Sequence, residues 1–245
     1  MEKLDHSSKI NGKLKQVFIT GISQGIGKSI ARVLLCSGYQ VIGTVRSLDD
    51  KQFLEEELNP LGTKQLSIKI CDLSFPHEIE SLKKSLNNLS IDVLINNAGI
   101  GIKKSFDKIS LEDWNNTIQT NLTASFLLAQ WAFSTMKKAN KGGLIIQISS
   151  MASVPYADKL DGFVAYTASK YAVAGLIENI AVEGKPYGIN SLCISPDAVN
   201  TRMLKHMAPE LEQKMEPLDI ALFVRNMVEN FNPYLSGLNI PLRTN

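Results

Sequence analysis

The chain has 245 residues, and its 26 Lys and Arg against 24 Asp and Glu give a formal net charge of +2. This length fits one globular domain with a sizeable core and leaves little room for a second. The near-neutral balance argues against nucleic acid as the main partner, and no apolar run approaches the ~20 residues of a membrane span.

Short apolar runs alternate with amphipathic stretches along the chain. In order, the pattern predicts strand 17–20, helix 25–37, strand 40–44, a weaker helix 49–58, strand 66–71, helix 76–88, strand 91–95, a long helix 110–139, strand 144–148, helix 163–184, strand 190–194, helix 217–230, and a last edge strand at Leu238, Ile240 and Leu242. Several strands lack polar alternation, as expected for strands covered on both faces. The sequence therefore predicts one α/β domain over residues 1–245, a three-layer, doubly wound parallel sheet.

The chain offers no metal or disulfide framework. Its cysteines and histidines are scattered singly, at Cys36, Cys71, Cys193, His6, His77 and His206. Such thiols are typical of a reducing cytoplasm, and zinc ligands would be clustered. Residues 1–16 alternate charged and polar residues and lack the apolar core of a signal peptide. We expect a cytoplasmic protein without a bound metal.

A glycine-rich segment follows the first predicted strand directly. Residues 20–27 read Thr-Gly-Ile-Ser-Gln-Gly-Ile-Gly, and a predicted helix begins there. Glycines allow a close backbone approach, while the free N–H groups and dipole of a helix N-terminus attract a pyrophosphate. The alternative is an ordinary tight turn, but the strand–loop–helix context favours a dinucleotide.

Polar residues follow the later strands, where ligands bind in sheets of this type. Asp72 and Leu73 come after the third strand, and residues 96–99 after the fourth read Asn-Asn-Ala-Gly. Four residues then follow in chain order: Asn121, Ser150, Tyr166 and Lys170. Together with the Thr-Gly-x-x-x-Gly-x-Gly spacing, these motifs resemble the short-chain dehydrogenase/reductase family over about residues 14–240.

The resemblance implies a Rossmann fold, a nicotinamide dinucleotide and a carbonyl or alcohol substrate. Asp72 matches the acid that contacts the adenine. The implied cofactor residues are Gly21, Ser23, Gln24, Gly25, Ile26, Gly27, Arg46, Asp72, Leu73, Asn97, Ala98, Gly99, Tyr166, Lys170, Pro196, Val199 and Thr201.

Tyr166 and Lys170 lie four residues apart on a predicted helix, so their side chains emerge on one face. A neighbouring ammonium would lower the pKa of a tyrosine from ~10 and make its proton exchangeable. Ser150 is placed to stabilise the charge that develops on a substrate oxygen. Ser149 is the other serine, but Ser150 fits the family's Ile-Ser-Ser stretch better.

The resemblance implies that Tyr166 is the general acid and base. It further implies that Asn121 holds a water that connects Lys170 to solvent, and that Lys170 also binds the nicotinamide ribose. Taken singly, these residues fit ordinary surface packing, helix caps or solvated positions. Their coincidence with the glycine loop favours the catalytic interpretation.

The turn after the second strand bears on the choice of cofactor. An acid there selects NAD, whereas a basic residue accommodates the 2′-phosphate of NADP. Arg46 occupies this turn, and Asp49 and Asp50 lie further along. Gln24 adds no positive charge. We expect NADP(H) as the preferred cofactor, with NAD(H) and an NAD-dependent alcohol dehydrogenase as the alternative.

The chain departs from the family pattern in three segments, and a fourth occupies the family's usual lid position. Asp197 stands where the family has glycine, either keeping the loop's shape or placing a carboxylate near the nicotinamide. Residues 155–161 contain about three extra residues at the expected substrate mouth. Residues 203–208 occupy the position of a lid, where methionines suit a partly apolar substrate or simple packing. Residues 240–245 lack the family's Asp-Gly-Gly ending.

Two other function classes compete with an enzyme of this type. A non-catalytic nucleotide-binding regulator would keep the fold, but the intact tetrad disfavours it. An extended epimerase or dehydratase needs a larger C-terminal substrate domain than the chain offers. We expect a homo-oligomer, either a tetramer or a dimer, that binds neither nucleic acid nor membrane.

Overall fold

The computed structural model describes residues 9–10, 13–61, 65–87 and 89–244. The strands are β1 (Lys9–Ile10), β2 (Lys13–Leu14), β3 (Gln16–Ile19), β4 (Gln40–Val45), β5 (Leu66–Ile70), β6 (Val93–Asn96), β7 (Gly143–Ile148), β8 (Ile189–Pro196) and β9 (Asn239–Leu242). The α-helices are α1 (Gly25–Cys36), α2 (Leu48–Leu58), α3 (Pro76–Ser85), α4 (Leu111–Ile118), α5 (Ala124–Ala139), α6 (Val164–Gly184), α7 (Arg202–Met207) and α8 (Pro217–Glu229).

Strands β3 to β9 form one sheet in the order β5-β4-β3-β6-β7-β8-β9, and every neighbouring pair is parallel. The order reverses between β3 and β6, where doubly wound sheets bind their ligands. Strands β1 and β2 form a separate antiparallel pair that the sequence did not predict. The predicted single, three-layer α/β domain is confirmed.

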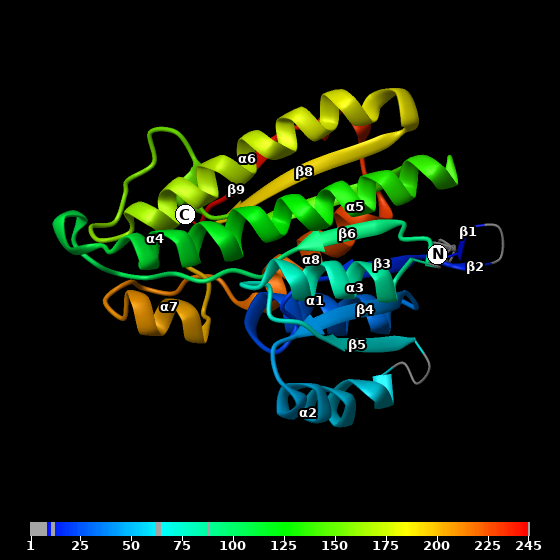
Figure 1. Ribbon diagram of the computed structural model, residues 1–245, viewed down its shortest axis with the longest axis horizontal. Coiled ribbons are helices and arrows are strands. Elements are labelled where there is room, and N and C mark those ends of the chain that lie inside the picture. Colours follow the sequence, from blue (N-terminus) through cyan, green and yellow to red (C-terminus); the bar gives the residue numbers. More distant parts are fainter. Residues whose placement is uncertain (1–8, 11–12, 62–64, 88, 245) are drawn as a thin grey trace.

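Successive side chains of each strand enter different halves of the core, because side chains alternate across a sheet. On β3, Val17 and Ile19 pack in the half that contains residues of α1, α2 and α8. Phe18 packs in the other half, with residues of α3, α5 and α6. Figure 1 shows these helices around the sheet.

The predicted helices are present with shifted ends. Helix α2 begins at Leu48, behind Ser47, which accepts a hydrogen bond from the Asp50 N–H. Helix α3 ends at Ser85, and Asn88, where the prediction ended, lies outside the described residues. Ser110 caps α4 in a capping box with Asp113.

The prediction of one regular helix over residues 110–139 is wrong in its middle. Residues Gln119–Thr123 form a π-helical turn between α4 and α5. Such a turn holds an extra residue and frequently marks a functional site. It places Asn121 at the bend.

The expectation for residues 1–16 falls largely outside the described residues, as does His6. In the part of the chain that the structure describes, no helix has both the length and the apolar character needed to cross a membrane. Across those same residues, no three His, Cys, Asp or Glu side chains gather in a group that could hold a metal ion.

Candidate active site

The glycine loop joins β3 to α1 at the carboxyl edge of the sheet. Gly21 and Gly25 adopt φ angles of +68° and +58°, a region that side chains other than glycine rarely adopt. A Cβ on Gly27 would overlap the carbonyl of Gly21 and the amide nitrogen of Asn97. The backbone of Gln24 caps α1 without a side-chain hydrogen bond. The first turn of α1 therefore fits a pyrophosphate.

The residues that follow β6 hold this loop by hydrogen bonds. The hydroxyl of Thr20 accepts hydrogen bonds from the N–H groups of Asn97 (2.9 Å) and Ala98 (3.0 Å). The side chain of Asn97 donates to the carbonyls of Thr20 (2.9 Å) and Gly21 (3.0 Å). Asn97 and Ala98 thus hold the glycine loop in shape, and the clamp by Thr20 is a contact that the sequence motif alone did not reveal.

The segment after β8 meets the glycine loop from the other side. A Cβ on Gly25 would lie 3.3 Å from the methyl of Thr201. Thr201 also caps α7 by accepting the N–H of Leu204 at 3.2 Å. Val199 is buried and pairs in a parallel bridge with Met215. The predicted cofactor residues on both sides therefore come together.

Asp197 is exposed, and its carboxylate accepts the N–H of Ala198 at 2.9 Å. The described non-glycine residues with positive φ are Asn140 and Tyr156, so the backbone at Asp197 does not require glycine. This geometry supports the interpretation that the loop keeps its shape with an aspartate. The proposed influence of its carboxylate on a nicotinamide stays a prediction.

Two predicted cofactor residues lie near the far edge of the sheet. Arg46 follows β4 directly and is exposed. Asp72 follows β5, and its carboxylate accepts the N–H (2.9 Å) and the hydroxyl (2.7 Å) of Ser74. Its own N–H donates to Glu78 at 2.7 Å. Leu73 is buried beside it.

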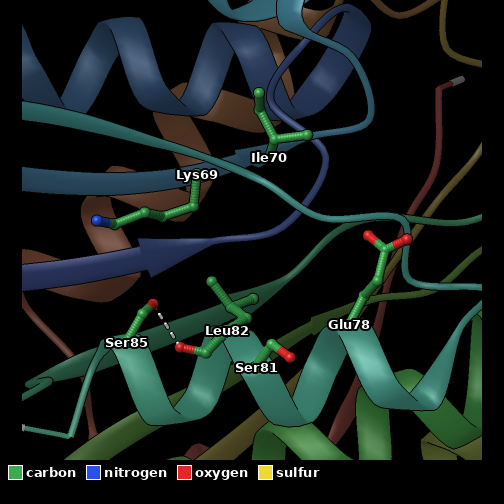
Figure 2. A pocket seen from close by; sticks show the side chains of 6 residues that line it. All are labelled: Lys69, Ile70, Glu78, Ser81, Leu82 and Ser85. Carbon is green, nitrogen blue, oxygen red and sulfur yellow. Dashed lines mark hydrogen bonds between the residues drawn. The ribbon is translucent and has the colours of Figure 1, made fainter.

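Glu78 also lines a groove of about 260 Å³ between β5 and α3. Figure 2 shows Lys69 and Ile70 on the strand and Ser81, Leu82 and Ser85 on the helix beside it. The groove runs along the edge of the sheet, apart from Tyr166.

The other predicted cofactor residues of the glycine loop form its outer surface. Ser23 and Ile26 are half-buried, and Gln24 is exposed.

Helix α6 brings Tyr166 and Lys170 together, as their spacing predicted. The ammonium of Lys170 lies 5.5 Å from the ring centroid of Tyr166. It donates a hydrogen bond to the carbonyl of Ile148 at 3.1 Å and is 4% exposed. Ser150 hydrogen-bonds the Tyr166 side chain, whereas Ser149 is buried and directed toward Ser153 and the carbonyl of Lys170. This geometry favours Ser150 over Ser149 at the site.

Burial dominates the electrostatics of this pair. It raises the pKa of Tyr166, and the hydrogen bond with Ser150 acts in the opposite direction. The net change in the Tyr166 pKa is therefore upward, opposite to the expected lowering. Burial lowers the pKa of Lys170 to about 8, because a buried ammonium loses its hydration.

The π-helical turn directs Asn121 at the same place. Its side chain accepts the N–H of Ile100 (2.8 Å) and donates to the carbonyl of Ile100 (2.9 Å) and to the Ser169 hydroxyl (3.0 Å). A Cβ on Gly99 would lie 3.2 Å from Asn121 Oδ1 and 3.6 Å from Lys170 Nζ. Asn121 therefore holds the segment after β6 against Lys170, and the water that it was expected to bind stays a prediction.

Helix α7 packs against Tyr166. Leu204, Met207 and Leu211 pack with Phe163 and Tyr166 in a small apolar cluster. Met207 leaves no room for a side chain at position 101, because a Cβ on Gly101 would overlap its sulfur. An ion pair of 2.6 Å joins Lys103 to Glu210 just beyond α7. The segment predicted to be a lid thus covers the candidate site.

The extra residues 155–161 lie almost entirely on the surface, and Tyr156 is fully exposed with φ of +61°. Gly162, at the end of this segment, accepts the N–H of Lys104 at 3.0 Å. The insertion therefore borders the segment that follows β6, on the same side as α7. Figure 1 shows the insertion and the segment that follows β6 at the end of the molecule where α4 and α6 begin.

Comparisons with known proteins agree with this geometry. A family model described as short chain dehydrogenase matches residues 15–212. An NAD-dependent glycerol dehydrogenase from Listeria innocua is 33% identical over 194 residues, 78% of this chain and 73% of that one. A 3-oxoacyl-(acyl-carrier-protein) reductase from Aquifex aeolicus is 30% identical over 242 residues, 94% of this chain and 95% of that one.

A solved short-chain type dehydrogenase/reductase from Mycobacterium marinum superposes with a TM-score of 0.85 at 27% identity, covering 93% of each chain. The match of sequence and fold extends over most of the chain. The protein belongs to the short-chain dehydrogenase family and is an oxidoreductase that acts on alcohol and carbonyl groups.

Proposed function

We propose that the enzyme interconverts a ketone and an alcohol with NADP(H) as its preferred cofactor and Tyr166 as general acid and base. The observation that carries the catalytic assignment is the meeting of Tyr166, Ser150 and Lys170 beside the glycine loop. The bound nicotinamide supplies or accepts the hydride. The side chains of the enzyme hold the substrate oxygen and move its proton.

Ser150 and Tyr166 both act on the substrate oxygen, Ser150 by hydrogen bonding and Tyr166 by proton transfer. Ser150 Oγ accepts the Ala152 N–H at 3.2 Å, so its own hydrogen can be donated to the Tyr166 hydroxyl or to the substrate. In reduction Tyr166 donates its proton to the carbonyl oxygen, and in oxidation it takes the proton back. With a pKa of about 8, Lys170 is mostly an ammonium at neutral pH, which favours the phenolate when it forms.

Arg46 supports the choice of NADP(H). It stands directly after β4, in the turn where an acid would bind the ribose 2′-hydroxyl of NAD. Its exposed guanidinium is a suitable partner for a 2′-phosphate. Asp49 and Asp50 lie in the first turn of α2, where their carboxylates are stabilised by the positive end of that helix's dipole. NAD dependence, which the Listeria relative carries in its name, is the alternative.

Arg46→Ala tests this assignment. We expect kcat/KM with NADPH to fall roughly tenfold or more, the loss of one charge-assisted contact, while kcat/KM with NADH stays unchanged. Steady-state kinetics with each cofactor against a fixed ketone measure the effect. Arg32→Ala, an exposed arginine on α1, is the control. Equal use of both cofactors, unaffected by Arg46→Ala, would contradict the role.

The cluster formed by α7 supports a substrate with an apolar part beside its carbonyl. Phe163, Met207 and Leu211 surround the approach to Tyr166 with carbon and sulfur. An apolar group of a ketone would replace these contacts when α7 opens. A panel of ketones of increasing chain length, followed by cofactor absorbance, identifies the preferred size.

We also propose self-association as a dimer or tetramer in a reducing, cytoplasmic compartment. Large apolar side chains are exposed on adjoining helices, with Trp114 on α4, Phe126 on α5 and Val182 on α6. Burying such surface between copies would stabilise an oligomer. Cys36, Cys71 and Cys193 are free thiols. Sedimentation velocity measures the oligomer, and a monomer at micromolar concentration would contradict it.

A further inference from the structure

A buried group of polar side chains lies under the loop that carries Ser150. We call it the serine–asparagine network. It joins Ser149 after β7, Ser153 at the end of a short 3-10 turn, Ser195 on β8 and Asn239 at the start of β9. The three serines are at most 6% exposed. Figure 1 shows β8 and β9 side by side near the start of α6.

Three members of the network form a closed ring. Ser195 Oγ donates to Asn239 Oδ1 at 2.6 Å. Asn239 Nδ2 donates to Ser153 Oγ at 3.2 Å, and Ser153 Oγ lies 2.9 Å from Ser195 Oγ. Because a hydroxyl has one hydrogen, the bond from Ser195 to Asn239 leaves the Ser195 oxygen as an acceptor, and Ser153 supplies the hydrogen that closes the ring. The ring holds the three side chains in contact.

The network ends on the backbone of two candidate catalytic residues. The carbonyl of Ser150 lies 2.9 Å from Ser153 Oγ and is the second acceptor, beside Ser195, for the one hydrogen of that hydroxyl. Ser149 Oγ lies within hydrogen-bond distance of Ser153 Oγ (3.0 Å) and of the carbonyl of Lys170 (3.2 Å). The last strand of the sheet is thereby connected to both Ser150 and Lys170.

The serines of the network are buried, and burial strengthens hydrogen bonds. Burial raises the pKa of the neighbouring Cys193 thiol to about 11, while hydrogen bonds with Ser149 and Ser195 act in the opposite direction. In a low-dielectric interior a fully satisfied polar network is rigid, and a partly satisfied one is costly. Removing one member therefore displaces the others.

We propose that Ser153, Ser195 and Asn239 are positioning residues that set the placement of Ser150 and Lys170 for proton transfer. The inference rests on the proposed function of those two residues. It assigns a role at the site to Ser195 on β8 and Asn239 on β9. A displacement of about 1 Å at a catalytic group can cost roughly 100-fold in rate, so a small shift of the loop has a measurable effect.

Ser195→Ala and Asn239→Ala test the proposal, each with a matched control. Ser191→Ala is the control for the first, because Ser191 lies on the same strand and face and is fully buried, and its hydroxyl donates to the carbonyl of Ile177 at 2.7 Å. Asn190→Ala, a half-buried asparagine on β8, is the control for the second. The measurements are kcat and KM for diacetyl with NADPH, the Kd of NADPH and Tm.

We expect both network variants to lower kcat roughly tenfold or more, with the Kd of NADPH and the KM for diacetyl within about twofold of the wild type. Ser191→Ala should lower Tm as much as Ser195→Ala does, yet leave kcat within about twofold. Asn239 is half-buried on the last strand of the sheet, so Asn239→Ala keeps the test valid if Ser195→Ala fails to fold.

Equal kcat in each network variant and its control, alongside an active wild type and an inactive Tyr166→Phe variant, would overturn the positioning role and leave the proposed function standing. If Tyr166→Phe retained full turnover, the proposed function itself would fail, and the positioning role with it. A wild type inactive on diacetyl and on the whole ketone panel overturns both.

Discussion

Tyr166→Phe is expected to lower kcat by roughly 10²- to 10⁴-fold, the range that a positioned acid–base group contributes, and to leave the Kd of the cofactor nearly unchanged. The reason is geometric. The Tyr166 ring is held by Phe163 and by the other members of the α7 cluster, so phenylalanine keeps the packing and loses the hydroxyl that Ser150 hydrogen-bonds. Single-turnover reduction of a ketone with saturating NADPH measures the chemical step.

Tyr171→Phe is the matched control. Tyr171 lies on the same helix, and its hydroxyl donates to the carbonyl of Val154 at 3.1 Å. Removing this hydroxyl deletes one exposed hydrogen bond without touching the candidate site. We expect kcat of this variant within about twofold of the wild type. Full turnover by Tyr166→Phe would show that another group transfers the proton.

The sequence was sufficient to predict the layers of the fold because apolar runs and helical faces have different periods. It also located the strand ends, where Asn97, Ser150 and Thr201 stand. Parallel strands bring their carboxyl ends to one edge, so residues distant in sequence could be grouped before any contact was known. The hydrogen bonds from Asn97 and Ala98 to Thr20 and the packing of Thr201 against Gly25 join segments that this grouping brings to one edge, but the structure was needed to find the contacts themselves.

Other features could not be predicted, because they depend on burial and on single contacts between distant segments. The π-helical turn at Asn121 has no signature in the periodicity of residues 110–139. The spacing of Tyr166 and Lys170 predicted a shared face but gave no measure of desolvation, which reverses the expected direction of the tyrosine pKa. The pairing of Ser153 with Ser195 joins residues 42 positions apart.

Lys170→Met is expected to abolish measurable turnover and to make the fold more stable at neutral pH. The two effects have one cause, which is that the ammonium is buried at the site. Burial lowers the pKa of Lys170 from 10.5 to about 8, and one unit corresponds to ~1.4 kcal/mol. The charge therefore destabilises the folded state by about 3 kcal/mol below pH 8.

Methionine keeps the length of the side chain and removes this penalty. It also removes one of two hydrogen bonds to the carbonyl of Ile148, the other being donated by the Gln147 side chain, which costs about 1–2 kcal/mol. A net gain of about 1–2 kcal/mol in the free energy of unfolding at pH 7 remains, and chemical denaturation measures it. Lys185→Met, an exposed lysine just after α6, is the control and should change stability by less than about 0.5 kcal/mol.

The pH dependence gives a second, independent check on the buried ammonium. Below pH 8 Lys170 is charged in both the folded and the unfolded chain, so the full penalty applies. Between pH 8 and 10.5 the folded protein releases the proton while the unfolded chain keeps it, and wild-type stability rises relative to Lys170→Met. The advantage of the variant should therefore shrink across this interval. A constant difference from pH 7 to 10 would mean that Lys170 stays charged in the fold, and its pKa would then be close to that of an exposed lysine.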